Sequence, residues 1–173
     1  MNSFRLNKIL GTILGTLLVV QAIRIADGAF APAKPVEPAP AKQEAAPPGV
    51  QPIEPLLASA SAERGQDAAK PCAICHNFQE GQGPKIGPDL YGVVGRRVAS
   101  MPGFNYSPAL KGKSGTWTFE ALNAWIANPR ADVPGTTMTF PGLPNEKRRA
   151  DVIVYLNTLS HNPVPLPQAT SGK

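Results

Sequence analysis

The strongest constraint on this chain is the pentapeptide CAICH, residues 72–76. It holds the only two cysteines in 173 residues, and His76 is one of only two histidines. Three chemistries use two thiols separated by two residues. A redox dithiol of the thioredoxin type requires a βαβ pattern and no adjacent histidine. Structural zinc requires four ligands, and beyond Cys72, Cys75 and His76 the chain offers only the distant His161.

The third chemistry is covalent haem attachment, for which C-x-x-C-H is the signature. Cys72 and Cys75 would then form two thioether bonds to one haem c, and His76 would bind the iron. Both thiols are used in this way, so no further cysteine is needed. A disulfide or a pair of buried thiols is the ordinary alternative. The motif favours haem, and a second axial ligand would settle the choice.

Methionine is the obvious type of second ligand, because a His/Met pair fills both axial positions and raises the reduction potential. The chain has three methionines, of which Met1 lies ahead of an apolar segment and is set aside. Met101 lies in ASMPGF and Met138 in VPGTTMTFPGL. A methionine is most often ordinary apolar packing. Spacing alone does not choose between Met101 and Met138.

Six stretches stand in the order of a class I c-type cytochrome: CAICH, GPDLYGVVGRR, PGFNYSPAL, TWTFEALNAWIANP, VPGTTMTFPGL and RADVIVYLNTLS. The chain resembles the family of mitochondrial cytochrome c and its proteobacterial relatives over residues 60–160. The resemblance implies that Met138 binds the iron opposite His76. It also implies that the Pro88 carbonyl accepts a hydrogen bond from His76, which fixes the orientation of the imidazole.

The same resemblance implies a binding site for a haem propionate. Tyr106 and Trp117 match the residues that hydrogen-bond the propionate, and Arg96 matches the arginine near it. A propionate buried without such donors would be very costly. Two positions beside the haem depart from the mitochondrial pattern, since Leu110 stands in place of an asparagine and Trp125 in place of a tyrosine. The family's reduction potential is therefore not expected to carry over.

A third departure lies next to the proposed distal ligand, where Thr137 replaces a lysine. With it, the family's alkaline ligand switch is not expected either.

The apolar pattern predicts an all-α domain over residues 56–160. The resemblance implies that this domain is a small cytochrome c fold wrapped around one covalently bound haem. A first helix begins at Ser59 or Ser61 and runs through AERGQDAAK. The resemblance implies that Gly65 lets this helix cross closely over the last one, at Tyr155. A middle helix spans residues 119–127. The last helix starts near Asn145 and has one apolar face, made of Val152, Ile153, Tyr155, Leu156 and Leu159.

The N-terminal third predicts a membrane anchor. Residues 9–23 carry no charge, and as a helix they would span about 22 Å against a hydrocarbon core of ~30 Å. Lys8 and Arg24 can snorkel and extend the span. We therefore expect a cytoplasmic N-terminus at residues 1–8 and a single transmembrane helix at residues 9–26. NKILGTILGTLL resembles the uncleaved anchor of membrane-bound respiratory cytochromes c of proteobacteria.

A cleaved signal peptide is the alternative, with A-F-A at residues 29–31 as the processing site. Pro32 directly after that bond disfavours cleavage. Residues 27–55 are rich in Pro and Ala, cannot bury a core and favour an extended polyproline II tether. Residues 161–173 are expected to be a similar mobile tail in which His161 is solvated.

The predicted function is that of a one-electron carrier and not an enzyme. The resemblance implies that it passes electrons from the cytochrome bc1 complex to a terminal cytochrome c oxidase of an aerobic respiratory chain. We expect a single-pass protein of the inner membrane with its haem domain, a monomer, on the periplasmic side, and no nucleic-acid partner. The alternatives are a soluble periplasmic carrier and, in another class, a haem peroxidase or gas sensor. The last two need an open iron site and acid–base residues over the iron. The sequence offers no spare histidine for that acid–base work.

Overall fold

Two helices from opposite ends of the domain are fixed by the capping residues that the sequence shows. Ser61 caps α3 (Ala62–Ala68), and its hydroxyl accepts the hydrogen bond of a backbone N–H three residues on. Asn145 caps α7 (Glu146–Thr158) in the same way. Such caps satisfy N–H groups that have no partner inside the helix. Both predicted helix starts are therefore confirmed, while α3 ends two residues before the predicted AERGQDAAK stretch does.

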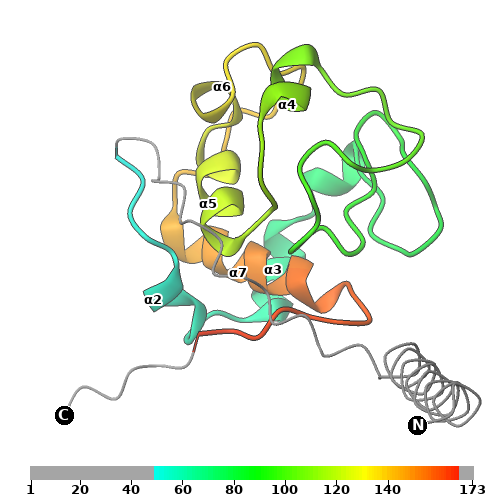
Figure 1. Cartoon of the computed structure of the whole chain (residues 1–173). Helices are drawn as coiled ribbons and strands as arrows, with labels where there is room; N and C mark the ends of the chain where they lie inside the picture. Colours follow the sequence, from blue (N-terminus) through cyan, green and yellow to red (C-terminus); the bar gives the residue numbers. More distant parts are fainter. Residues whose placement is uncertain (1–48, 168–173) are drawn as a thin grey trace, which may run out of the picture. The chain divides into compact units, whose positions relative to one another are not determined.

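These two helices form the main helix–helix contact of the domain (Figure 1). They approach so closely at Gly65 that a Cβ there would overlap the backbone carbonyl of Asp151 and lie 2.7 Å from the Cβ of Tyr155. Only glycine fits such a crossing, which outweighs its poor helix propensity. The Tyr155 ring meets Phe78 edge to face, with 5.8 Å between centroids. The close crossing predicted at Gly65 and Tyr155 is confirmed.

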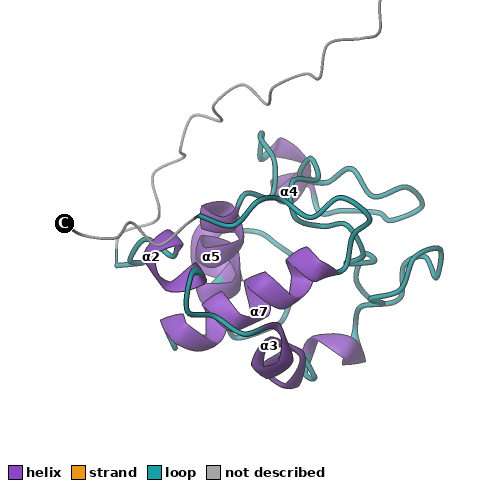
Figure 2. Cartoon of the chain, turned by 90° about the horizontal axis from the view of Figure 1, so that it is seen from below, coloured by secondary structure: helices purple, strands orange, loops and turns teal. Residues whose placement is uncertain are grey.

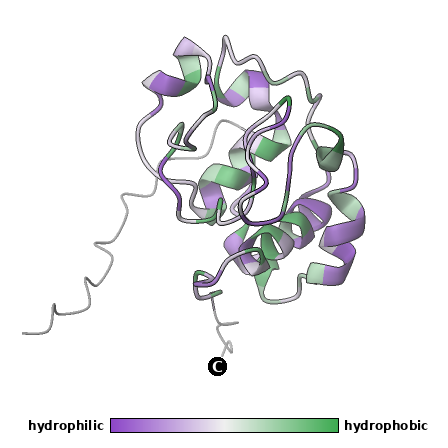
Figure 3. Cartoon of the chain, turned by 90° about the vertical axis from the view of Figure 1, so that its right-hand side faces the viewer, coloured by the Kyte–Doolittle hydropathy of each residue, from purple (hydrophilic) through white to green (hydrophobic). Residues whose placement is uncertain are grey.

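The middle helix, α5 (Phe119–Ala127), has the predicted bounds and packs against α7. Thr118 caps it. Figure 3 shows apolar and polar residues sharing the same helices, as helices packed on one face require. Shorter elements complete the described fold, and the sequence pattern did not predict them: α2 (Glu54–Leu57), η1 (Cys72–Ile74), α4 (Pro108–Gly112) and α6 (Pro129–Asp132).

Long loops make up the rest of the domain, as Figure 2 shows. The longest runs between η1 and α4. Within residues 49–167 the only β pairing is an isolated bridge between Arg97 and Thr116. The all-α expectation therefore holds for this part of the chain. Some loop residues, among them Val93, Val98 and Val133, are buried in the core with the helices.

The computed structural model describes residues 49–167. The predicted cytoplasmic N-terminus at 1–8, the predicted transmembrane helix at 9–26, the linker from 27 to 48 and the last six residues lie outside the described residues. Within the described range, no helix has the length and apolarity needed to cross a membrane.

The packed domain extends beyond both predicted boundaries. Ile53 and Leu57 are buried at 0 % and 1 % exposure, so packing begins before residue 56. At the other end, Asn157 and Val164 exchange two hydrogen bonds of 2.8 and 2.9 Å. The segment after residue 160 is therefore fastened to α7 at least as far as Val164. Composition misplaced both boundaries, because a few apolar residues in a Pro-rich stretch are enough to dock it.

Candidate functional site

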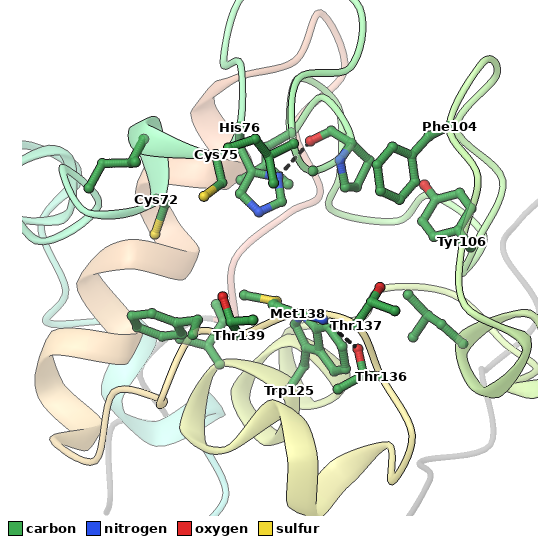
Figure 4. A pocket seen from close by; sticks show the side chains of 18 of the residues that line it. Cys72, Cys75, His76, Phe104, Tyr106, Trp125, Thr136, Thr137, Met138 and Thr139 are labelled. Carbon is green, nitrogen blue, oxygen red and sulfur yellow. Dashed lines mark hydrogen bonds between the residues drawn. The ribbon is translucent and has the colours of Figure 1, made fainter.

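A cavity of about 310 Å³ opens between two walls of the domain (Figure 4). Cys72, Cys75 and His76 lie on one wall, which we call the proximal wall. Met138 lies on the facing wall with Trp125 beneath it. Most of the lining is apolar side chain. Such a space suits a flat, apolar group that is contacted by nitrogen from one side and sulfur from the other.

The imidazole of His76 is oriented by a hydrogen bond from its far side. Nδ1 lies 2.6 Å from the carbonyl oxygen of Pro88. A carbonyl can only accept, so Nδ1 donates and Nε2 is left with a lone pair for a metal. Burial lowers the pKa of His76, against the opposing effect of the Pro88 hydrogen bond. The ring is therefore neutral at neutral pH, which is the form that ligates metals.

Cys72 begins the 3-10 turn η1, and Cys75 caps its end. The backbone N–H groups of Cys75 and His76 both bond to the carbonyl of Cys72, at 3.1 and 2.9 Å. This turn places both thiols on the cavity wall beside the imidazole. Both cysteines are free thiols, which excludes the disulfide alternative. Burial raises the pKa of the Cys72 thiol.

Met138 faces the cavity from a tight loop after α6. The hydroxyl of Thr136 accepts a hydrogen bond from the Met138 N–H at 3.2 Å, and the Thr136 N–H donates to Val133. Gly135 in the same turn has a φ of +90°, a conformation that favours glycine. Met101 lies elsewhere and does not line the cavity. The structure thus separates two methionines that spacing left equal.

Met101 instead belongs to a cluster beside the cavity. The guanidinium of Arg96 donates to its sulfur at 3.5 Å and to two backbone carbonyls of the 89–91 turn. Burial lowers the pKa of Arg96. Tyr106 lines the cavity, and its hydroxyl accepts a hydrogen bond from the Met101 N–H at 3.2 Å. Trp117 is 7 % exposed and packs against Trp125, with 5.5 Å between rings.

Of the three residues expected around a propionate, only Tyr106 therefore lines the cavity itself, while Arg96 and Trp117 lie behind the wall. The three departures from the mitochondrial pattern, Leu110, Trp125 and Thr137, all lie on the lining.

Several lining residues were not singled out from the sequence: Ile74, Ile86, Phe104, Thr139 and Phe140. One of them, Phe104, could have been recognised from the sequence. Phe104 and Tyr106 stand two residues apart in a Gly- and Pro-rich loop, and their rings meet edge to face at 4.7 Å. Aromatic residues in a loop without a helix or strand to pack against indicate an apolar group nearby.

The residues present fit a haem. Two free thiols lie on one wall, a neutral imidazole points inward, and a thioether faces it from the opposite wall. His161 is exposed, as predicted, and its Nε2 lies 2.9 Å from Oε2 of Glu80; it does not line the cavity. Within residues 49–167, no cluster of three or more His, Cys, Asp and Glu could hold a metal ion by itself. The zinc alternative is thereby disfavoured.

Comparison with known proteins gives close relatives. No family model matches the chain. A "Cytochrome c homolog" of Bradyrhizobium diazoefficiens is 48 % identical over 183 residues, covering 98 % of this chain and 100 % of that protein. The "Cytochrome c-type cyt cy" of Rhodobacter capsulatus is 43 % identical over 114 residues, covering 65 % of this chain and 56 % of that one. The solved structure of cytochrome cH from Methylobacterium extorquens is similar with a TM-score of 0.54 and 41 % identity, covering 57 % of this chain and 99 % of that one.

Proposed function

Because this chain belongs to the class I c-type cytochromes, electron carriers that hold a covalently bound haem c, we propose that it is a membrane-tethered carrier of an aerobic respiratory chain. In this proposal it passes single electrons from the cytochrome bc1 complex to a terminal cytochrome c oxidase. The observation that carries the proposal is the pair of possible axial ligands, His76 and Met138, on facing walls of one apolar cavity.

When bound, the haem supplies a one-electron Fe(III)/Fe(II) couple. His76 and Met138 would fill both axial positions, which leaves no position for a substrate. Cys72 and Cys75 would fix the group covalently. Within the described residues, the cavity shows no second histidine for acid–base chemistry. These features favour the carrier over a peroxidase or gas sensor.

Tethering rests on the N-terminal residues. The uncharged run at residues 9–23 has the composition of a short membrane span, and the Pro- and Ala-rich linker follows it. The similarity to the Bradyrhizobium diazoefficiens protein extends over 98 % of the chain and so includes most of this region. Haem is attached outside the cytoplasm, so the domain would face the periplasm.

A tether changes how partners are found. From Leu56 onward the chain has twelve Lys and Arg against eight Asp and Glu, a surplus of four. Steering by so small a surplus is weak and falls with ionic strength. Confinement at the membrane raises the effective concentration of integral partners instead. Electron delivery by the full chain should therefore depend little on salt.

The test compares the full chain with a variant that lacks residues 1–31 and is exported behind a cleavable signal. Both are measured for membrane retention after a carbonate wash and for the rate of oxidation by oxidase-containing membranes across a salt series. The proposal expects the full chain to stay in the membrane, and the shortened chain to be released, slower and more salt-sensitive. A full chain found in the soluble fraction would show a soluble carrier instead. Equal rates and equal salt slopes for the two forms would rule out the role of the tether in finding partners.

A further inference from the structure

Loop 139–145, which links Met138 to α7, is fastened to the body of the protein by very few bonds. One is the backbone hydrogen bond from the Leu143 N–H to the Ile126 carbonyl in α5, 2.8 Å long. Apart from the bonds by which Asn145 caps α7, the others come from one side chain, Arg149 of α7. Its Nη1 donates to the carbonyls of Leu143 and Pro144 at 2.9 and 2.6 Å. A single guanidinium therefore holds two consecutive carbonyls of the loop.

Arg149 is itself held in an unusual environment for a charged group. It is 4 % exposed, and burial lowers its pKa. Its hydrogen-bond acceptors among residues 49–167 are neutral: the two loop carbonyls and Oδ1 of Asn123, which accepts from Nε at 2.8 Å. A buried guanidinium is expensive unless its donors are satisfied. Lysine cannot replace arginine at this position without loss of hydrogen bonds, because it lacks the planar fork that serves three acceptors.

Asn123 extends the network to the beginning of the domain. It is fully buried, and its Nδ2 donates to the Gln51 carbonyl at 2.8 Å and to Oε2 of Glu120 at 3.3 Å. The other carboxylate oxygen of Glu120 accepts from the backbone N–H groups of Ile53 and Glu54, at 2.7 and 3.2 Å. Segment 51–54, where the predicted linker meets the domain, is therefore bonded to α5.

These contacts form one continuous chain from segment 51–54 to loop 139–145. We propose that Glu120, Asn123 and Arg149 form a polar clamp that positions the Met138 loop and fastens it to the point where the chain enters the haem domain. The clamp residues are positioning residues, because they act through the loop and do not line the haem cavity. The inference rests on the proposed role of Met138 as an iron ligand.

The test measures how often the loop releases Met138, using cyanide as the probe in the oxidised full-length protein. Cyanide binds the iron only where the methionine sulfur has left it, so the binding rate reports loop opening. Arg149→Lys keeps the charge but loses the fork. We expect cyanide to bind about tenfold faster or more, since a hydrogen bond to a charged group commonly changes an equilibrium by that factor. The matched control is Arg97→Lys at an exposed position, with the wild-type rate expected.

Glu120, at the end of the clamp nearest segment 51–54, gives a second variant with a smaller expected effect. Glu120→Ala releases the two N–H groups of segment 51–54 and should raise the cyanide rate about threefold. Glu63→Ala, an exposed glutamate of α3, is its control. If Arg149→Lys does not fold, Glu120→Ala decides the question. Wild-type cyanide rates in a folded Arg149→Lys or in Glu120→Ala would overturn the clamp.

Hydrogen exchange at the Leu143 amide separates failure of the clamp from failure of the ligand assignment. This amide bonds to α5 whether or not Met138 binds iron. If the wild type lacks the weak near-infrared band of Met-ligated Fe(III), the proposed ligation is wrong. The clamp still predicts faster exchange at Leu143 in Arg149→Lys than in Arg97→Lys, and equal exchange in the two would refute it.

Discussion

The two walls of the cavity are built in different ways. The proximal wall is made within eighteen residues by local bonds: the turn at η1, the hydrogen bond from His76 to Pro88 and the bond from the Gly87 N–H to the Cys75 carbonyl. The distal wall is formed by the loop that carries Met138, which we call the distal loop. This loop has a short turn around Thr136, but its end at Leu143 is held by hydrogen bonds to α5 and to Arg149.

This difference explains what each wall contributes. A wall closed by local bonds and two covalent attachments presents its ligand in one fixed orientation, whatever the rest of the chain does. A wall that depends on side chains from distant elements can open while the helices remain packed. Exchange of the distal ligand should therefore precede global unfolding, and loss of the proximal ligand should not.

The largest expected effect comes from removing the covalent attachment. Replacing both Cys72 and Cys75 with alanine should leave the haem loosely held and reduce the yield of folded protein severely, because the loops have little core without it. The measurement is acid–acetone extraction, which removes non-covalent haem. A double variant whose haem resists extraction would show that attachment does not occur at this motif.

Replacing Met138 is the most direct way to disrupt the distal wall. Met138→Ala should abolish the near-infrared band of the oxidised protein, lower the reduction potential strongly and open the iron to small ligands. The helical circular dichroism should change little, since the proximal wall remains. Met101→Ala is the matched variant, because its sulfur accepts from Arg96 and does not line the cavity. If Met101→Ala caused these losses and Met138→Ala did not, the ligand would have to be reassigned.

The proximal wall can be strained without removing a ligand. A Cβ at Gly87 would overlap the His76 ring, with its Nδ1 only 2.7 Å away. Gly87→Ala should therefore displace the imidazole and cost about 1–3 kcal/mol of unfolding free energy, as overpacking does. Urea unfolding measures it. Gly112→Ala, where nothing lies within 4 Å of a new Cβ, should be close to neutral. Equal stability of both variants would show that the proximal wall is not tightly packed.

The same contrast decides what could be predicted from the sequence. The chemistry of CAICH could be predicted because the two thiols, the imidazole and its hydrogen-bond acceptor are close together in the sequence. The caps at Ser61 and Asn145 and the glycine at the α3–α7 crossing were also readable, since each acts on its own helix or follows the resemblance. Met138 could not be chosen by spacing, because a loop's direction depends on distant contacts.

Two kinds of feature could not be predicted from the sequence, and the reasons are physical. The clamp at Arg149 joins residues about a hundred positions apart. Arg149 is the last of three consecutive basic residues in α7, and nothing in that run shows which of them is buried or what it bonds to. The domain boundaries were misplaced because single apolar residues such as Ile53 dock a Pro-rich segment that composition describes as linker.

The last expected effect arises at the α3–α7 crossing, which supports both walls alike. Asp151 of α7 is 8 % exposed, and it accepts from the Arg64 guanidinium at 2.8 and 2.9 Å and from the Ser61 N–H at 2.7 Å. Burial alone would raise the pKa of Asp151, but the Arg64 and Ser61 hydrogen bonds outweigh burial and lower it. Its stabilising effect is therefore complete above the unfolded pKa of about 4 and is lost as pH falls through the folded pKa.

Asp151→Asn should accordingly cost about 2 kcal/mol at pH 7, a typical value for hydrogen bonds to a charged group. The difference from the wild type should shrink as the pH falls below about 4. Asp67→Asn, at an exposed ion pair with Lys70, is the control and should change stability by under about 1 kcal/mol. The α3–α7 crossing underlies both walls, so in Asp151→Asn the near-infrared band and the helical signal should shift by the same amount along the urea axis. A near-infrared band that shifts further than the helical signal would mean that the crossing supports the distal loop more than the proximal wall.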